Sequence, residues 1–267
     1  MADQWQSYDS AASVHDRLAV PGIFTPPAKD LVACLDLPDS GTILDVGTGT
    51  GVAALLAMQA ANRGTVVGLD PSVEMLRKAR SHGLRCAVAG FVPGLPFPAR
   101  KFDRALASFV LSHLDSYQAA LLDMARVLRP GGKLGVTAWG AMRSAPRERW
   151  QELADSFAGK DALRAAVKQA LPWEEWFEDP AHLKQAFEEA GLENIVLRHT
   201  EYTTRMSIAD FIAIRETSLQ ARFMRQTLDR ARWEEFKQTV SEEFRREFRD
   251  PIEYTRDVHI AVGQALP

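Results

Sequence analysis

The sequence predicts an α/β fold in which helices cover both faces of a mostly parallel sheet. Short apolar runs alternate with helical patterns between residues 42 and 139. The first run, Thr42 to Val46, leads into glycines at positions 47, 49 and 51 and then into a helical stretch, Val52 to Asn62. A strand covered on both faces is expected to be apolar throughout, and glycine admits the backbone angles of a tight turn. These observations predict a strand, a glycine loop and a helix as the organising unit.

This glycine loop is expected to hold a ligand of nucleotide size, because the first N–H groups of the following helix point back toward it. A dinucleotide site would place its third glycine at position 52, but that residue is Val52 and the third glycine is Gly51. Asp45 precedes Gly47 by two residues. A carboxylate there would repel a phosphate and favour a ligand that carries an ammonium or sulfonium charge.

The run 42–51, Thr-Ile-Leu-Asp-Val-Gly-Thr-Gly-Thr-Gly, resembles motif I of the class I S-adenosylmethionine-dependent methyltransferases. Three further stretches extend the resemblance in the family's order, and together they cover about residues 25 to 140. They are the acid Asp70 with Pro-Ser-Val-Glu-Met-Leu (71–76), the motif IV-like run 102–114, and the run 125–139 with Arg-Pro-Gly-Gly at its centre. Within this superfamily the sequence resembles the small-molecule branch typified by ubiquinone/menaquinone C-methyltransferases.

The resemblance implies a Rossmann-like, doubly wound sheet of seven strands, with the last strand antiparallel and paired between the fifth and sixth. Helical lid insertions complete this fold. The expected parts are an N-terminal cap segment (1–24), a cofactor-binding core (25–140), a helical insertion (141–190), the last core strands (191–204 and 255–267) and a helical lid over the acceptor (205–254).

The individual elements follow from local signals. A helix over 10–19 is expected to end at Pro21-Gly22, and a second over 27–35 begins after Thr25. Leu121 and Leu122 are expected to face inward on a helix that begins at Asp115 or Ser116. The remaining helices are predicted over 72–81, 146–158, 161–171, 180–190 and within 207–250, and the remaining strands over 65–69, 84–89, 102–108, 133–139, 192–203 and 257–263.

The implied cofactor is S-adenosyl-L-methionine, with S-adenosyl-L-homocysteine as its product. Asp70 lies 19 residues after Gly51 and is expected to accept hydrogen bonds from the ribose hydroxyls. Phe91 stands where the family usually has an Asp that accepts from the adenine amine, so stacking on Phe91 and the Val92 N–H would hold the base. The complete set expected at the cofactor is Asp45, Gly47, Thr48, Gly49, Gly51, Asp70, Pro71, Met75, Phe91, Val92, Ser108 and Phe109.

Methyl transfer is an in-line displacement, so the protein mainly has to position two reactants and exclude water, and no metal is expected. His113 is the candidate general base, with a packing role as the alternative. Tyr8, Trp139 and Arg143 are the candidate acceptor contacts. Arg215 and His182 are further candidates by position, and the aromatic residues Trp173, Trp176 and Phe177 are expected in the core more than in an acceptor pocket.

Composition limits the partners and the location. The 267 residues carry a formal net charge of −3, which gives no reason to expect nucleic acid or an anionic membrane. Cys34 and Cys86 lie in apolar runs and are expected to be core thiols in a reducing compartment. No secretory leader and no uncharged membrane-length run are expected, so the predicted location is the cytoplasm.

The predicted function is methyl transfer to a small-molecule acceptor, by an enzyme of class EC 2.1.1.-. The alternatives are a relative that uses the same cofactor for another transfer, such as aminopropyl or carboxymethyl transfer, and a cofactor-binding scaffold without turnover. A dinucleotide dehydrogenase is disfavoured by the glycine spacing. The sequence leaves open the acceptor, the accepting atom, the use of a base, the oligomeric state and the pathway.

Overall fold

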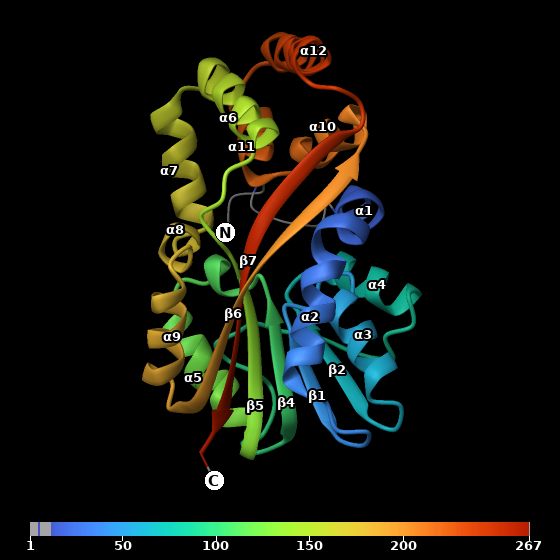
Figure 1. The fold of residues 1–267 in the computed structure, drawn as a ribbon, viewed down its shortest axis with the longest axis vertical. Helices are drawn as coiled ribbons and strands as arrows, with labels where there is room; N and C mark the ends of the chain where they lie inside the picture. The colour runs from blue at the N-terminus through green and yellow to red at the C-terminus, as the bar shows by residue number, and fades with distance from the viewer. Residues whose placement is uncertain (1–4, 6–11, 267) are drawn as a thin grey trace.

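A computed structural model describes residue 5 and residues 12–266, and it contains one seven-stranded sheet (Figure 1). The strand order is β3-β2-β1-β4-β5-β7-β6. The bounds are β1 Thr42–Val46, β2 Thr65–Asp70, β3 Cys86–Ala89, β4 Phe102–Ser108, β5 Leu128–Trp139, β6 Leu192–Met206 and β7 Ile252–Ala265. β7 pairs antiparallel with both β5 and β6, while the pairs among β1 to β5 are parallel. The predicted place and direction of the last strand are therefore confirmed.

The central strands are apolar because both faces of the sheet are covered by helices. On one face lie α2 (Thr25–Leu35), α3 (Val52–Ala60) and α4 (Val73–Ser81), and their buried residues pack on Ile43, Val66 and Ile260. On the other face lie α5 (Tyr117–Val127) and α9 (Pro180–Glu189), which pack on Leu44, Ala105 and Val136 among others. Two hydrophobic cores therefore hold the sheet between them.

A helical cap forms a third core beyond the carboxyl ends of the parallel strands (Figure 1). It comprises α6 (Ala145–Ala158), α7 (Lys160–Ala170), α10 (Ile208–Glu216), α11 (Leu219–Thr227) and α12 (Arg230–Glu247). The apolar stripe of α12, formed by Trp233, Phe236, Val240 and Phe244, is buried there. The carboxyl-terminal half of β6 and the amino-terminal half of β7 run past the end of β5 into this cap. Met206, Ile252 and Tyr254 join the core of the cap.

The insertion predicted over 141–190 divides between the two parts of the molecule. α6 and α7 belong to the cap, whereas α8 (Glu174–Phe177) and α9 place Phe177, Leu183 and Phe187 in the core under the sheet. The difference arises because the apolar stripe of α9 packs on β6 and β7, beside α5. The sequence pattern marks such a stripe but does not identify the surface that it covers.

The N-terminal helix differs from the prediction. Helical structure does not end at Pro21-Gly22 but continues from α1 (Ala12–Val14) through the π-helical η2 (His15–Phe24) into α2. Pro21 lies inside η2, and Thr25 lies at the start of α2 without a capping role for its side chain, whose Oγ1 donates to the Val20 carbonyl. The wider π-type turn accommodates a proline that an α-helix would not.

The continuous segment Ala12–Leu35 is long and apolar enough, by length and composition alone, to cross a membrane. Its α2 half buries Ala28, Leu31, Val32 and Leu35 against the sheet, which accounts for this apolar composition.

Two predictions of burial are wrong. Cys86 is exposed because β3 is the edge strand, and Cys34 is only half-buried. Leu122 is 55 % exposed because it lies on the outer side of α5, whereas Leu121 is fully buried. An apolar run thus indicates a strand or a helix without indicating how completely neighbouring elements cover it.

Candidate functional site

The glycine loop lies at the carboxyl end of β1, as predicted, and all three glycines are left-handed. Their φ angles are +66° at Gly47, +54° at Gly49 and +94° at Gly51, a region that other residues rarely adopt. A Cβ at Gly47 would lie 2.5 Å from Val110 Cγ2, whereas one at Gly49 would meet no atom within 4 Å. Gly47 therefore permits close packing on the residues after β4, and Gly49 faces open space that can receive a ligand.

Asp45 lies beneath this loop and is 1 % exposed. Its Oδ2 accepts from Thr48 Oγ1 at 2.6 Å and from the Ala54 N–H at 3.0 Å. Desolvation raises the pKa of Asp45 to about 7, against the lowering effect of these hydrogen bonds. Its role in the structure is to hold the loop and the start of α3, and the open negative charge expected at the surface of the loop is not present.

Asp70 ends β2 and joins the loop to the next helix. Its Oδ2 accepts from the Gly49 N–H at 2.9 Å, and its Oδ1 accepts from the Ser72 N–H at 2.8 Å. The side chain is only 7 % exposed. Ser72 Oγ in turn accepts from the Met75 N–H and caps α4. The structure therefore brings Asp70, the glycine loop and the start of α4 into one hydrogen-bonded unit.

The residues expected around the adenine lie on the adjoining edge of the sheet. Pro71 is exposed and Met75 is buried on α4. Phe91 is 70 % exposed in the loop after β3, and Val92 is half-buried against the core. The exposed ring of Phe91 can stack on a base. Its role in holding the adenine stays a prediction.

The end of β4 forms an aromatic wall. Phe109, directly after Ser108, has a left-handed φ of +58°, an uncommon and strained value for a residue with a side chain. Thr137 fixes this conformation, because its Oγ1 accepts from the Phe109 N–H at 3.0 Å and lies 3.1 Å from Ser108 Oγ. The Phe109 ring stacks on Trp139 with a centroid distance of 3.9 Å, and Phe24 packs edge-on against both. The sequence pattern did not indicate Thr137 or Phe24.

His113 ends the short turn η3 (Leu111–His113) that follows β4. His113 is exposed to solvent, and desolvation by the protein around its ring lowers the pKa of His113 to about 4. Glu174 raises and Arg222 lowers the pKa of this imidazole. The imidazole is therefore neutral at pH 7 and able to accept a proton, although its low pKa makes it a weak base.

The other predicted acceptor contacts lie in different places. Tyr8 lies outside the described residues. Arg143 pairs with Glu178 and donates to the Ala141 carbonyl. Trp139 belongs to the aromatic wall described above.

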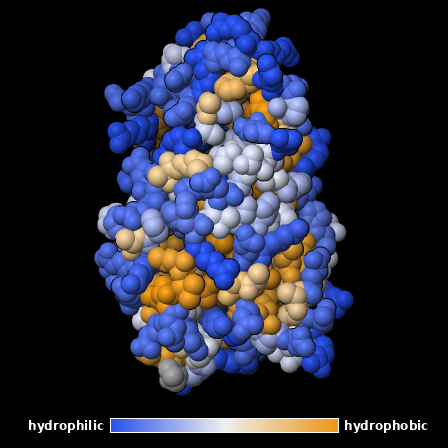
Figure 2. Space-filling model, in the orientation of Figure 1, coloured by the Kyte–Doolittle hydropathy of each residue, from blue (hydrophilic) through white to orange (hydrophobic). Residues whose placement is uncertain are grey.

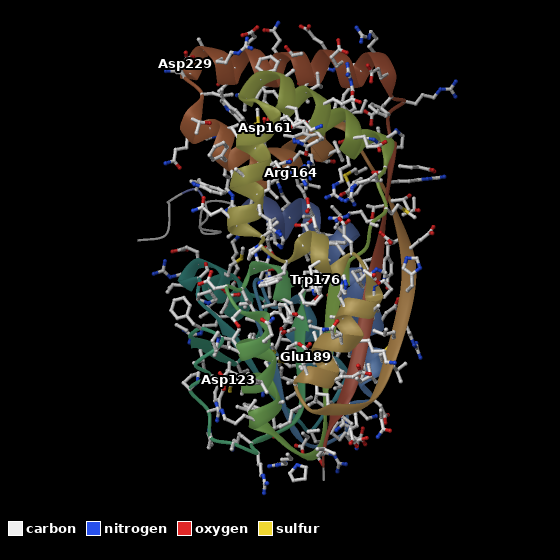
Figure 3. All side chains as sticks on the ribbon, turned by 90° about the vertical axis from the view of Figure 1, so that its left-hand side faces the viewer. Asp123, Asp161, Arg164, Trp176, Glu189 and Asp229 are labelled. Carbon is white, nitrogen blue, oxygen red and sulfur yellow. The ribbon has the colours of Figure 1, made fainter. Side chains whose placement is uncertain are left out.

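Two of the three aromatic residues between α7 and α9 lie in the core, as expected. Phe177 is fully buried, and Trp173 packs against the same core through Tyr117. Trp176 is partly exposed and stacks on His182 at a centroid distance of 3.5 Å. Figure 3 shows Trp176 on the side of the molecule, at the level where the cap meets the core.

Three arginines that are far apart in the sequence converge at the junction of cap and core, and we refer to Arg147, Arg215 and Arg256 as the arginine cluster. Glu174 Oε1 lies 3.6 Å from Arg147 Nη2 and 3.9 Å from Arg256 Nη2. Desolvation lowers the pKa of Arg215 to about 10 and also lowers that of Arg256. Of the three, the sequence indicated only Arg215, by its position. Arg147 and Arg256 lie among other charged residues, a pattern typical of an exposed surface.

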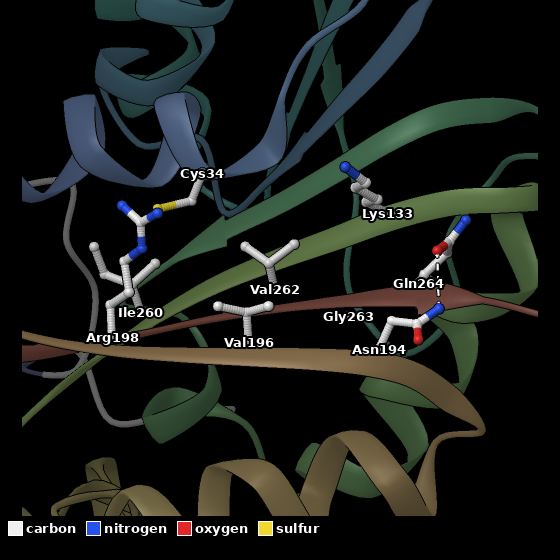
Figure 4. A pocket seen from close by; sticks show the side chains of 9 residues that line it. All are labelled: Cys34, Lys133, Asn194, Val196, Arg198, Ile260, Val262, Gly263 and Gln264. Atoms are coloured by element: carbon white, nitrogen blue, oxygen red, sulfur yellow. Dashed lines mark hydrogen bonds between the residues drawn. The ribbon is translucent and has the colours of Figure 1, made fainter.

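An open pocket also lies between the end of α2 and the strands β5, β7 and β6, away from the glycine loop (Figure 4). It has a volume of about 290 Å³ and is lined by Cys34, Lys133, Arg198 and aliphatic residues of β6 and β7. Hydrophobic residues gather over this lower half of the face, whereas the cap above is mostly hydrophilic (Figure 2). Because ligands of open α/β sheets bind beyond the carboxyl ends of the strands, we do not assign the cofactor to this pocket.

The seven-stranded sheet with β7 inserted between β5 and β6, and the glycine loop after β1, define the class I methyltransferase fold. Residues 44–136 match the family described as a methyltransferase domain. This part of the chain is therefore similar to methyltransferase domains, and the sheet has the Rossmann-like fold of S-adenosylmethionine-dependent methyltransferases.

Two curated relatives illustrate the similarity. The chain is 38 % identical over 105 residues to the ubiquinone/menaquinone biosynthesis C-methyltransferase UbiE of Syntrophotalea carbinolica, an alignment that covers 38 % of this chain and 44 % of that protein. It is 32 % identical over 117 residues to the trans-aconitate 2-methyltransferase of an Azoarcus species, covering 42 % of this chain and 44 % of that protein. The alignments thus span less than half of either relative.

Among solved structures, the fold matches phosphoethanolamine N-methyltransferase 2 of Haemonchus contortus, which was solved in complex with S-adenosyl-L-methionine. The TM-score is 0.60 at 13 % identity, with all of this chain and 61 % of that chain covered. This similarity supports the fold of the chain as a whole.

Proposed function

We propose that the protein transfers the methyl group of S-adenosylmethionine to a small-molecule acceptor. The observation that carries this proposal is the unit formed by the glycine loop and Asp70, in which the Gly49 N–H donates to Asp70 Oδ2. Asp70 also ends β2 at the edge of the sheet where an acid can accept from the ribose hydroxyls of a bound nucleoside. The open space over Gly49 fits the close approach of such a ligand.

When bound, S-adenosylmethionine supplies a methyl group activated by a positively charged sulfur. The chain's own contribution is to orient the reactants and to exclude water. Ser108 and the Phe109–Trp139 wall lie at the end of β4, next to the glycine loop through Val110, and are positioned to flank the reacting centre. Neutral His113 on the adjoining turn is the candidate to accept a proton from the acceptor.

In this proposal the core and the cap bind different reactants. Residues of the core before position 110 would hold the cofactor, and the cap of α6, α7 and α10 to α12 would close over the acceptor. The relatives named above are a C-methyltransferase of ubiquinone/menaquinone biosynthesis and a trans-aconitate methyltransferase, which supports a small molecule as acceptor. A cytoplasmic location and independence from nucleic acid are part of this proposal.

The test is incubation with S-adenosylmethionine that carries a deuterated methyl group and with a fractionated metabolite extract. We expect one or more products that carry the deuterated methyl, together with S-adenosylhomocysteine. Asp70→Ala protein in the same extract is the control and should give far less product. Cofactor turnover that yields a transferred aminopropyl or carboxymethyl group, or cofactor binding without any product, would contradict methyl transfer and support one of the alternatives.

A further inference from the structure

The arginine cluster lacks hydrogen-bond partners for several enclosed N–H groups. In the part of the chain that the structure describes, no acceptor bonds to Arg147 Nη1, Arg215 Nε, or Arg256 Nε and Nη2. Buried donors are nearly always paired in folded proteins, because leaving them without a partner is costly. These four N–H groups therefore have room for acceptors that the described residues do not provide.

The charges of the cluster are also unbalanced. Glu174 contacts two of the arginines at distances longer than a hydrogen bond, and among the described residues it is the one carboxylate within 4.0 Å of the cluster. Arg147 and Arg256 each lower the pKa of Arg215, and Arg147 also lowers that of Arg256, so the guanidinium groups lie close enough to repel one another. An anion among them would relieve this repulsion.

The cluster is adjacent to the reacting edge of the sheet. The Arg256 guanidinium lies over the Trp139 ring, with Cζ 3.7 Å from the centroid. Trp139 stacks on Phe109, which directly follows the end of β4. Arg147 comes from α6 and Arg215 from α10, so the cap supplies two of the three cations and the sheet supplies the third. A molecule held here would bridge the cap and the site of methyl transfer.

We propose that the arginine cluster binds an oxyanion of the methyl acceptor, a carboxylate or a phosphate, while the Phe109–Trp139 wall contacts its less polar part. The planar guanidinium group matches both oxyanions through paired N–H donors. A neutral acceptor would leave the same N–H groups unpaired, so the cluster would select against it. This inference rests on methyl transfer as the proposed function and adds the chemical class of the acceptor.

The test uses protein saturated with S-adenosylhomocysteine, titrated calorimetrically with inorganic phosphate and, separately, with malonate. Sodium chloride at matched ionic strength is the reference. We expect at least one of the two anions to bind, and the tighter one identifies the oxyanion. Arg256→Gln should weaken that binding roughly 10-fold or more, as expected for the loss of hydrogen bonds to a charged group. Arg147→Gln gives a second, independent measurement if the first variant does not fold.

Arg205→Gln is the matched control. Arg205 lies on β6, the strand that pairs with β7, but it pairs with Glu253 on an exposed surface. It should bind the anion like the wild type. Equal anion binding by wild type, Arg256→Gln and Arg147→Gln would overturn the proposal, as would the absence of binding beyond that of chloride.

A titration of S-adenosylhomocysteine into the same variants separates this inference from the proposed function. Affinity should be unchanged in Arg256→Gln, and a matching loss there would assign the cluster to the cofactor's carboxylate and overturn its role in acceptor binding. Failure of the wild type to bind S-adenosylhomocysteine would contradict the proposed function. Phosphate and malonate titrated without S-adenosylhomocysteine would still measure anion binding by the arginine cluster.

Discussion

The Gly49 N–H and Asp70 Oδ2, which are 2.9 Å apart, connect the loop after β1 to the end of β2. Two neighbouring parallel strands thereby present one carboxylate and one glycine turn at the same edge of the sheet. The first prediction tests this unit. Asp70→Ala should weaken S-adenosylhomocysteine binding by roughly 10- to 150-fold, because hydrogen bonds to a charged group are lost. Calorimetry measures the effect.

Asp70 also holds the loop through Gly49 and Ser72, so a structural contribution must be separated. Asp70→Asn keeps one acceptor oxygen and should show an intermediate affinity. Asp39→Ala, at an exposed ion pair with Arg63, is the neutral control. Wild-type affinity in Asp70→Ala would exclude this residue from the cofactor site.

The second prediction concerns the exposed ring of Phe91. Phe91→Ala should weaken cofactor binding by about 1–3 kcal/mol, the range found for stacking of a base on an aromatic side chain. The free energy of unfolding should change by less than about 0.5 kcal/mol, as is usual for an exposed position. Phe91→Asp should recover part of the lost affinity through the adenine amine.

Val73→Ala provides the control, since Val73 is another exposed apolar residue, on the outer side of α4. If both Phe91 variants bind the cofactor as the wild type does, other groups hold the base.

The third prediction concerns the pH dependence of stability through Asp45. The folded-state pKa of this carboxyl is raised to about 7, above its ordinary value of 3.8, so the folded protein retains a proton that the unfolded chain releases. The stability contributed by this proton is present below pH 3.8 and is lost as the pH rises toward 7. The loss amounts to at most about 4 kcal/mol, at 1.36 kcal/mol per pKa unit.

Urea unfolding of wild type and Asp45→Asn at pH 4.5, 6 and 8 (about the window set by these pKa values) measures the effect. The amide does not titrate, so stability relative to the wild type should shift in favour of the variant as the pH rises. Other titrating groups cancel in this difference. If the free energies of unfolding of wild type and Asp45→Asn change in parallel with pH, Asp45 ionises at an ordinary pKa.

The fourth prediction concerns the cap. We expect S-adenosylhomocysteine alone to slow hydrogen exchange within residues 42–70, and phosphate or malonate added with it to slow exchange within 205–250, because Arg215 on α10 would then contact the anion. This follows the usual behaviour of lids, which order when the substrate completes the site. Protection of 205–250 in the free protein equal to that of β1 and β4 would show that this segment is part of a rigid core.

The sequence and its family resemblance were sufficient for the place of the last strand and for the loop, because those signals are local or belong to a motif. Alternating glycines and the acid after β2 lie within 30 residues of one another, and the backbone geometry they require is encoded in the residues themselves. The break expected at Pro21 was wrong because a π-type turn accommodates the ring, and local propensity carries no information on that choice.

The arginine cluster illustrates what the sequence could not indicate. Arg147, Arg215 and Arg256 come from two cap helices and one strand, and only the packing of α6 and α10 against the distal half of β7 brings them together. Thr137 was missed for a similar reason. Its hydroxyl lies within an apolar strand, and its importance appears only once the Phe109 N–H is placed beside it.

The measurement that tests the central claim most directly is a calorimetric titration of the wild-type protein with S-adenosylmethionine, S-adenosylhomocysteine and NAD. The carboxylate of Asp70 beside a loop whose third glycine is Gly51, and not at position 52, favours the two sulfur ligands over a dinucleotide. We predict a low-micromolar or tighter dissociation constant for both sulfur ligands and no measurable binding of NAD. Tight binding of NAD, or no binding of either sulfur ligand, would contradict the assignment of this protein as an S-adenosylmethionine-dependent methyltransferase.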